Sequence, residues 1–214
     1  MRAGQSRPVY LARMSRLAKE IHVTSDMQKI AEHLLSGARH LAIANAVAEY
    51  PFEVRAISKR RYTDRQKMET FFKDGFIDRY SGERLFNPGF LRLLHYLMPE
   101  QFPFHPHGKS GLCHDIFWDL LPSIDHKTPI YRGGEDQPGN WVTTSMKRNS
   151  AKGNWTIEDL GWNLQPRGAI QDWDGLSRIF VELVERYDPD VGYVKSWYRT
   201  TKKVLGDSEC RLSR

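Results

Sequence analysis

The chemistry of this sequence is concentrated in four polar residues near its middle. Asp125 and His126 are adjacent, Asn140 follows His126 after fourteen positions, and Asn149 follows Asn140 after nine. An unperturbed imidazole has a pKa of about 6.5 and can take a proton from water near neutral pH. Carboxylate and carboxamide oxygens are hard ligands suited to Mg²⁺ or Mn²⁺, and such an ion can stabilise charge on a phosphoryl group. With His126 as general base and Asp125 and Asn149 as metal ligands, the set suits phosphodiester hydrolysis.

The elements that must position these residues are a strand, a loop, a second strand and a helix. The pattern indicates strands at 122–130 and 141–144, a turn-rich loop at 132–140, and a helix at 145–153 that ends at Gly153. Each residue has a structural alternative when taken singly. A histidine in a strand is usually part of the packing, and an asparagine before a helix is usually a turn or cap residue. Together, at these intervals, the four favour a site.

This segment resembles the HNH endonucleases, or ββα-metal nucleases, whose signature runs Asp-His, a Gly-Gly loop, Asn, and then Asn or His on the following helix. Both intervals are typical of that family, and companion residues also match: Pro129, Arg132, Gly133, Gly134, Trp141, Val142, Ser150, Ala151 and Lys152. Similar segments recur in bacterial members of the family, which extends the resemblance over about residues 76–163. It implies an α+β fold with a ββα-metal core and helical extensions at both ends.

The same resemblance implies a function for the chain. It implies an endonuclease that depends on Mg²⁺ or Mn²⁺ and cleaves DNA, in which Asn140 holds the catalytic His126 by hydrogen bonding near its backbone. A single such unit cuts one strand, so a double-strand break needs a homodimer or two successive nicks. Two alternatives stay open: a nuclease acting on RNA, and a catalytically inactive nucleic-acid-binding or partner-binding protein on the same fold.

Basic side chains flank the four polar residues and could hold phosphate groups: Lys127, Arg132, Lys147 and Lys152. We favour Lys152, which falls about one helical turn after Asn149, as a member of the catalytic set. The alternative for each of them is an ordinary surface charge.

The usual zinc-binding Cys pairs of the family are absent from this chain. Aligning the hairpin "FIDRYSGERL" with the family puts Asp78 and Ser81 at the first pair, and Ser145 and Arg148 at the second. These side chains cannot make a tetrahedral thiolate site, so we expect no structural zinc there. We expect an ion pair between Asp78 and Arg148 in its place, the alternative being that both are solvated separately.

A second metal site is conceivable in the insertion at residues 102–118. It contains four possible zinc ligands within ten residues, namely His105, His107, Cys113 and His114. Their spacing matches no familiar zinc finger, so we favour histidines that pack or hydrogen-bond with their neighbours.

Helices are expected at both ends of the chain. Helical periodicity marks segments near 11–21, 27–35 and 38–50, and Thr63 with Gln66 has the spacing of a capping box ahead of a fourth. Residues 176–187 and 194–205 carry two more apolar stripes, and the last nine residues suggest a frayed tail. We therefore expect a basic helical region at 1–75, the HNH module at 76–165 and a C-terminal helical region at 166–214.

Composition bounds the remaining possibilities. The chain has 214 residues, of which 40% are hydrophobic, with two distant cysteines and no apolar run of membrane-spanning length. These features predict a cytoplasmic protein, bacterial by resemblance and nucleoid-associated when bound to DNA. Residues 1–73 hold 14 Lys and Arg against 7 Asp and Glu. That excess suits either a phosphate-backbone surface or a solvated face, and the basic start also suits an organellar presequence.

Overall fold

The computed structural model describes residues 25–50, 61–109 and 111–212, and the chain divides into two compact units at residues 1–59 and 60–214. In the first unit, residues 25–35 are helical and α2 spans Arg39–Glu49, as the periodicity predicted. Gly37, with φ of +77°, reverses the chain between them. The expected helix near 11–21 and the basic start of the chain lie outside the described residues.

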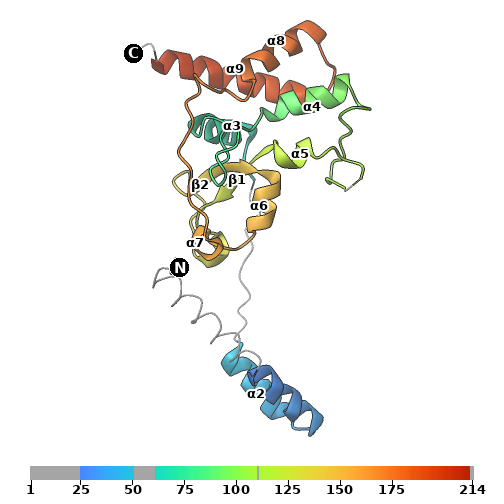
Figure 1. The fold of residues 1–214 in the computed structure, drawn as a ribbon, viewed down its shortest axis with the longest axis vertical. Coiled ribbons are helices and arrows are strands. Elements are labelled where there is room, and N and C mark those ends of the chain that lie inside the picture. The colour runs from blue at the N-terminus through green and yellow to red at the C-terminus, as the bar shows by residue number, and fades with distance from the viewer. Residues whose placement is uncertain (1–24, 51–60, 110, 213–214) are drawn as a thin grey trace, which may run out of the picture. The chain divides into compact units, whose positions relative to one another are not determined.

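The second unit has a helical layer that contains most of its core. Its helices are α3 (Asp64–Lys73), α4 (Pro88–Leu97), α8 (Ser177–Tyr187) and α9 (Gly192–Leu212), and Figure 1 shows α4, α8 and α9 gathered at one end with α3 beneath them. The buried side chains that join them are Met68, Phe71, Phe76, Leu93, Phe180, Val184, Val194, Trp197 and Val204. The capping box at Thr63 and Gln66 is confirmed, because each side chain accepts from the other residue's backbone N–H.

The C-terminal helix is longer than the sequence suggested. The prediction of a frayed tail from Gly206 onward is wrong, because α9 continues as far as Leu212. One glycine inside a helix costs only about 1 kcal/mol. Tertiary contact continues beyond it, since Arg65 Nη2 lies 3.3 Å from Asp207 Oδ2.

A small antiparallel sheet lies beside the helical layer. Strand β1 (Pro122–His126) pairs with β2 (Trp141–Ser145) so that His126 is opposite Trp141, and a 3₁₀ turn at Ile130–Arg132 lies between them. Helix α6 (Met146–Lys152) follows β2 at once, with Ser145 as its N-cap and Gly153 at its end. The expected order of strand, loop, strand and helix is thus present. The described part of the chain is an α+β structure with one two-stranded sheet.

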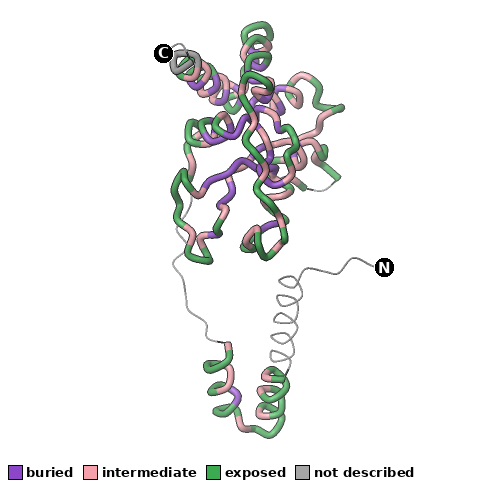
Figure 2. The backbone as a smooth tube through the Cα atoms, turned by 60° about the vertical axis from the view of Figure 1, so that its left-hand side comes forward, coloured by how far each residue is buried: buried purple, intermediate pink, exposed green. Residues whose placement is uncertain are grey.

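Short elements complete the second unit: a hairpin bridged by Ile77 and Arg84, α5 (Ile116–Asp119) and α7 (Ile157–Leu160). The boundaries expected near residues 75 and 165 do not separate compact units. The reason is that α3 and the C-terminal helices contribute side chains to one buried apolar cluster. Figure 2 shows the buried stretches of backbone on several segments of the second unit. No helix among the described residues is long and apolar enough to cross a membrane.

Candidate active site

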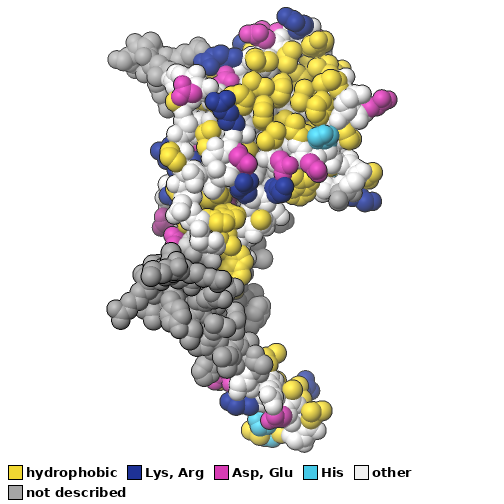
Figure 3. Space-filling view, viewed as in Figure 1, with side chains coloured by type: hydrophobic (Ala, Val, Ile, Leu, Met, Phe, Trp, Pro, Cys, Tyr) yellow, Lys and Arg dark blue, Asp and Glu magenta, His cyan; other side chains and the backbone are white. Residues whose placement is uncertain are grey.

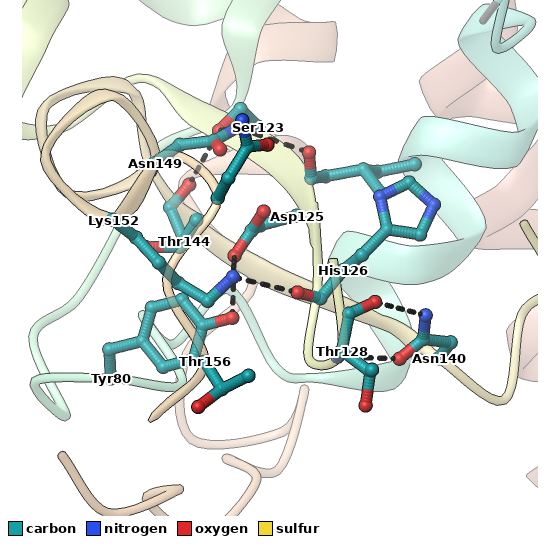
Figure 4. A network of polar contacts seen from close by, with 12 residues as sticks. Tyr80, Ser123, Asp125, His126, Thr128, Asn140, Thr144, Asn149, Lys152 and Thr156 are labelled. Carbon is teal, nitrogen blue, oxygen red and sulfur yellow. Dashed lines mark hydrogen bonds and ion pairs between the residues drawn. The ribbon is translucent and has the colours of Figure 1, made fainter. Parts of the chain in front are cut away.

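The end of β1 separates the predicted site residues into two groups. Successive side chains of a strand point to opposite faces, so the adjacent Asp125 and His126 diverge. Figure 4 shows the carboxylate of Asp125 on the same side of β1 as Asn149 and Lys152, and the imidazole of His126 on the other side. The structure therefore brings the two predicted metal ligands together and keeps the predicted general base apart from them.

The carboxylate of Asp125 is held through one oxygen. Its Oδ2 accepts a hydrogen bond of 2.6 Å from the Tyr80 hydroxyl and lies 3.0 Å from Lys152 Nζ. Burial, and then the negative charge of Asp125, raise the pKa of Tyr80 well above its ordinary value of 10.0, so its phenol is a neutral donor. Both contacts go to Oδ2, which leaves Oδ1 for a further ligand.

The side chain of Lys152 is buried, whereas a phosphate-binding side chain is expected to reach the surface. Lys152 is 0% exposed, and its ammonium donates to the His126 carbonyl oxygen over 2.9 Å in addition to pairing with Asp125. The reason is the rotation of α6, which turns its last residue under β1 rather than toward solvent. The prediction that Lys152 contacts a phosphate directly is therefore corrected. The ammonium of Lys152 contacts the candidate metal ligand Asp125 instead.

Asn149 is tethered to β1 through its amide nitrogen. Nδ2 donates to Ser123 Oγ over 2.9 Å and to the Ile124 carbonyl over 3.1 Å. This orientation leaves Oδ1 of Asn149, together with Oδ1 of Asp125, as the hard oxygen atoms of this side. The donor set fits Mg²⁺ or Mn²⁺, which take oxygen ligands and complete their shell with water and phosphate. Among the described residues, no three His, Cys, Asp or Glu side chains gather as a metal site.

The imidazole of His126 lies in a second polar group that the sequence did not reveal. Its Nε2 lies 2.9 Å from Asp136 Oδ1 and 3.3 Å from the Tyr62 hydroxyl, and His126 is only 3% exposed. The same Asp136 oxygen accepts from Tyr62 over 2.9 Å and from Trp141 Nε1 over 2.8 Å. Partial burial raises the pKa of Asp136, but the bonds from His126, Trp141 and Tyr62 outweigh it and the net pKa is lowered. Asp136 is therefore an ionised acceptor at neutral pH.

The side chain of Asn140 holds the loop that carries Asp136 through hydrogen bonds. Its Oδ1 accepts from the Thr128 backbone N–H over 3.0 Å, and its Nδ2 donates to the carbonyls of Thr128 and Glu135 over 2.8 and 2.9 Å. Gly134 permits this close approach, because a Cβ there would lie 1.9 Å from the Thr128 carbonyl oxygen. Asn140 thus bonds close to the backbone of His126, two residues beyond it, and also fixes the loop on the imidazole side.

The positions that the resemblance aligns with zinc ligands have partners that differ from the expected ones. Asp78 does not pair with Arg148; it is 0% exposed and accepts from Thr144 Oγ1 at 3.2 Å and from the Ser145 backbone N–H at 2.9 Å. Arg148 Nη2 instead lies 3.1 Å from Glu83 Oε2. The expected ion pair is wrong because backbone N–H groups satisfy the buried carboxylate of Asp78. The first hairpin is still joined to the start of α6.

The other candidate residues have local partners. Lys147 pairs with Asp119 at 2.9 Å and Arg132 with Asp159 at 3.1 Å. In the insertion, His105 Nδ1 accepts from the His107 backbone N–H, and His114 Nδ1 accepts from that of Ile116. His105, His107, Cys113 and His114 do not form a metal-ligating group in the described structure.

The residues of the candidate site that sequence reasoning missed are Asp136, Tyr62 and Tyr80. Asp136 lies in the turn-rich loop, where an acid is an ordinary turn residue, and Tyr62 and Tyr80 lie 64 and 45 positions from their partners at the end of β1. No local signal distinguishes them. Comparison of the chain with models of protein families, with curated proteins and with solved structures gives no match.

Proposed function

We propose that this protein is a metal-dependent endonuclease of the HNH type, with a ββα-metal core formed by β1, β2 and α6. One observation carries the proposal. Asp125 and Asn149, at the intervals typical of that family, present oxygen atoms on the same side of β1, while His126 extends from the next position of the strand. The proposal thus combines a sequence resemblance with a donor set that suits a divalent cation.

The opposite orientation of base and ligands suits in-line displacement at phosphorus. The attacking water and the leaving oxygen lie on opposite sides of the phosphoryl group in such a reaction. His126 would take the proton of the attacking water, while Asp125 and Asn149 would hold the cation. Bound Mg²⁺ would supply a Lewis acid that stabilises the charge on the leaving oxygen. Tyr80 and Lys152 would keep the Asp125 carboxylate turned so that Oδ1 faces the cation.

DNA is the proposed substrate, in keeping with the family resemblance. The excess of positive charge in residues 1–73 supports attraction to a nucleic-acid backbone. The face of the second unit seen in Figure 3 has Lys and Arg side chains scattered among acidic ones rather than in one basic patch. An RNA substrate is the alternative, because metal-assisted chemistry at phosphorus does not select the sugar. A bacterial cytoplasm with association to the nucleoid is the matching proposal for location.

The test is cleavage of supercoiled plasmid by the full chain. Wild type should produce nicked circles with Mg²⁺ and none with a chelator, and His126→Ala should lower the rate by about 10²–10⁴-fold. Glu135→Gln, which neutralises a neighbouring exposed acid, is the control that should cut like wild type. Equal nicking by wild type and His126→Ala would reject the mechanism.

A binding protein without catalysis is the second candidate. The observation that favours it is the burial of His126, whose Nε2 already contacts Asp136 and Tyr62. A labelled DNA or RNA duplex that binds in the presence of Mg²⁺ and stays intact for wild type would select this alternative over the nuclease.

A further inference from the structure

One carboxylate oxygen has three close polar neighbours, and one of them is the imidazole of the candidate general base. Asp136 Oδ1 lies 2.8 Å from Trp141 Nε1, 2.9 Å from the Tyr62 hydroxyl and 2.9 Å from His126 Nε2. An ionised carboxylate can only accept hydrogen bonds, and an indole N–H can only donate. Neutral His126 can therefore bond to this oxygen only with its proton on Nε2. The second ring nitrogen, Nδ1, then carries the lone pair.

We propose that Asp136 is a positioning residue of the nuclease reaction: it fixes the tautomer and the orientation of His126 so that Nδ1 is the atom that takes the proton from water. The inference rests on the proposed function and specifies how its base is prepared. A general base can act only through an unprotonated nitrogen, and the bond made by the other nitrogen decides which one that is. The structure assigns that bond to Asp136.

The carboxylate is held in place by groups other than His126. Trp141 is the register partner of His126 on β2, so its indole ties Asp136 to the residue directly opposite the base. The side chain of Asn140 fixes the loop through the carbonyl of Glu135, the residue before Asp136. Gly134 fits against the Thr128 carbonyl where a Cβ could not. Asp136 is thus a prearranged acceptor, as an orienting residue must be.

Tyr62 adds a second contact to the same arrangement. Its hydroxyl donates to Asp136, so its oxygen is an acceptor for the proton on His126 Nε2, 3.3 Å away. Its ring packs edge-on against Trp141 with the centroids 5.1 Å apart. Both contacts favour the Nε2-protonated tautomer, and none of the hydrogen bonds described to His126 involves Nδ1.

The decisive variant is Asp136→Leu, which keeps the approximate size of the side chain but removes the oxygen that contacts Trp141, Tyr62 and His126. Without that acceptor, the Tyr62 hydroxyl, 3.3 Å from Nε2, would donate to His126 Nε2, and the ring proton would move to Nδ1. Nitrogen-15 NMR of the imidazoles, at one pH where they are neutral, measures this directly without any catalytic turnover. His126→Gln identifies the signals of His126 among the eight histidines of the chain.

Kinetics on a DNA substrate complete the experiment. Asp136→Leu should lower kcat by about 10²-fold or more with KM changed less than about threefold, because the loss is in the proton-transfer step. Asp136→Glu, which restores a carboxylate acceptor, should recover part of kcat and the Nε2-protonated signal. Glu135→Gln, one position earlier in the loop, should change neither the tautomer nor kcat.

The outcomes separate the two proposals. A wild-type His126 protonated on Nδ1, or an Asp136→Leu variant with unchanged tautomer or unchanged kcat, overturns the role of Asp136 while leaving a nuclease that still needs His126. A wild-type protein that cleaves neither DNA nor RNA with Mg²⁺ overturns the proposed function. That result also rejects the positioning role of Asp136, which rests on that function. A shift of the proton to Nδ1 together with the fall in kcat supports both.

Discussion

Lys152 and Asp125 form a buried ion pair that joins the end of α6 to β1. Lys152 Nζ lies 3.0 Å from Asp125 Oδ2, and the two side chains are 0% and 9% exposed. The same ammonium donates to the His126 carbonyl, so one cation contacts both residues of the Asp-His pair through different groups. The helix that carries Asn149 is thereby held against the strand that carries Asp125.

Replacing Lys152 by methionine should destabilise the second unit. Lys152→Met keeps the length of the side chain but leaves the carboxylate of Asp125 buried without its cation, which costs about 3–5 kcal/mol in comparable pairs. Urea unfolding followed by tryptophan fluorescence measures the loss in free energy of unfolding, since all six tryptophans lie within residues 60–214.

Lys147→Met is the matched control on the same helix. Lys147 and its partner Asp119 are 66% and 44% exposed, so this variant should lose less than about 1 kcal/mol. Equal losses for the two variants would contradict the role of the buried pair.

Features set by short stretches of sequence could be predicted. The capping box at Thr63, the order of β1, loop, β2 and α6, and the stripe of α8 each depend on residues a few positions apart. Partners that meet only after folding could not be predicted, and Asp78 illustrates why. The resemblance aligned Asp78 and Arg148 with ligands of one ion, but a sequence does not show that backbone N–H groups bond to the acid instead.

The same limit applies to the candidate site. The residue types and intervals of Asp125, His126, Asn140 and Asn149 are visible in the sequence. Whether Lys152 faces solvent or β1 depends on the rotation of a seven-residue helix against its sheet. Asp136 meets His126 only because the loop folds back under Asn140. Both facts are set by tertiary contacts that local patterns do not encode.

Asp78 should matter more for stability than Arg148, although both stand where the family has zinc ligands. Asp78→Ala removes an acceptor shared by the Tyr80 and Ser145 backbone N–H groups and leaves them unsatisfied in a buried place. The expected loss is about 3 kcal/mol, since hydrogen bonds to a charged group contribute about 1.5–3 kcal/mol each. Arg148→Ala removes a partly exposed pair with Glu83 and should cost less than about 1 kcal/mol. The reverse order in urea unfolding would show that the buried hydrogen bonds of Asp78 contribute less to stability than the pair of Arg148 with Glu83.

Gly134 should be intolerant of a side chain. Gly134→Ala puts a Cβ within 1.9 Å of the Thr128 carbonyl oxygen, so the loop must move away from the end of β1 and take Asp136 with it. We expect a fall in nuclease kcat of at least about 10-fold, because a displacement of about 1 Å can cost 10²-fold in a positioned site. Gly139→Ala in the same loop meets nothing within 4 Å and should leave kcat unchanged. A fully active Gly134→Ala enzyme would show that the loop does not position the base.

Ser123 should tune magnesium affinity through Asn149. Its hydroxyl accepts from Asn149 Nδ2 over 2.9 Å, and this bond helps to fix the orientation of the Asn149 amide. Ser123→Ala leaves only the bond to the Ile124 carbonyl, so the candidate ligand becomes less constrained. Loss of an outer-shell partner typically weakens metal affinity by about 10–100-fold, and we expect a change near the lower end of that range. Isothermal calorimetry gives the Mg²⁺ Kd without turnover, and kcat at saturating Mg²⁺ should stay close to that of wild type.

Ser150→Ala, at an exposed position on α6 next to Asn149, is the control. If both variants bind Mg²⁺ as wild type does, Asn149 is not the ligand that this arrangement suggests.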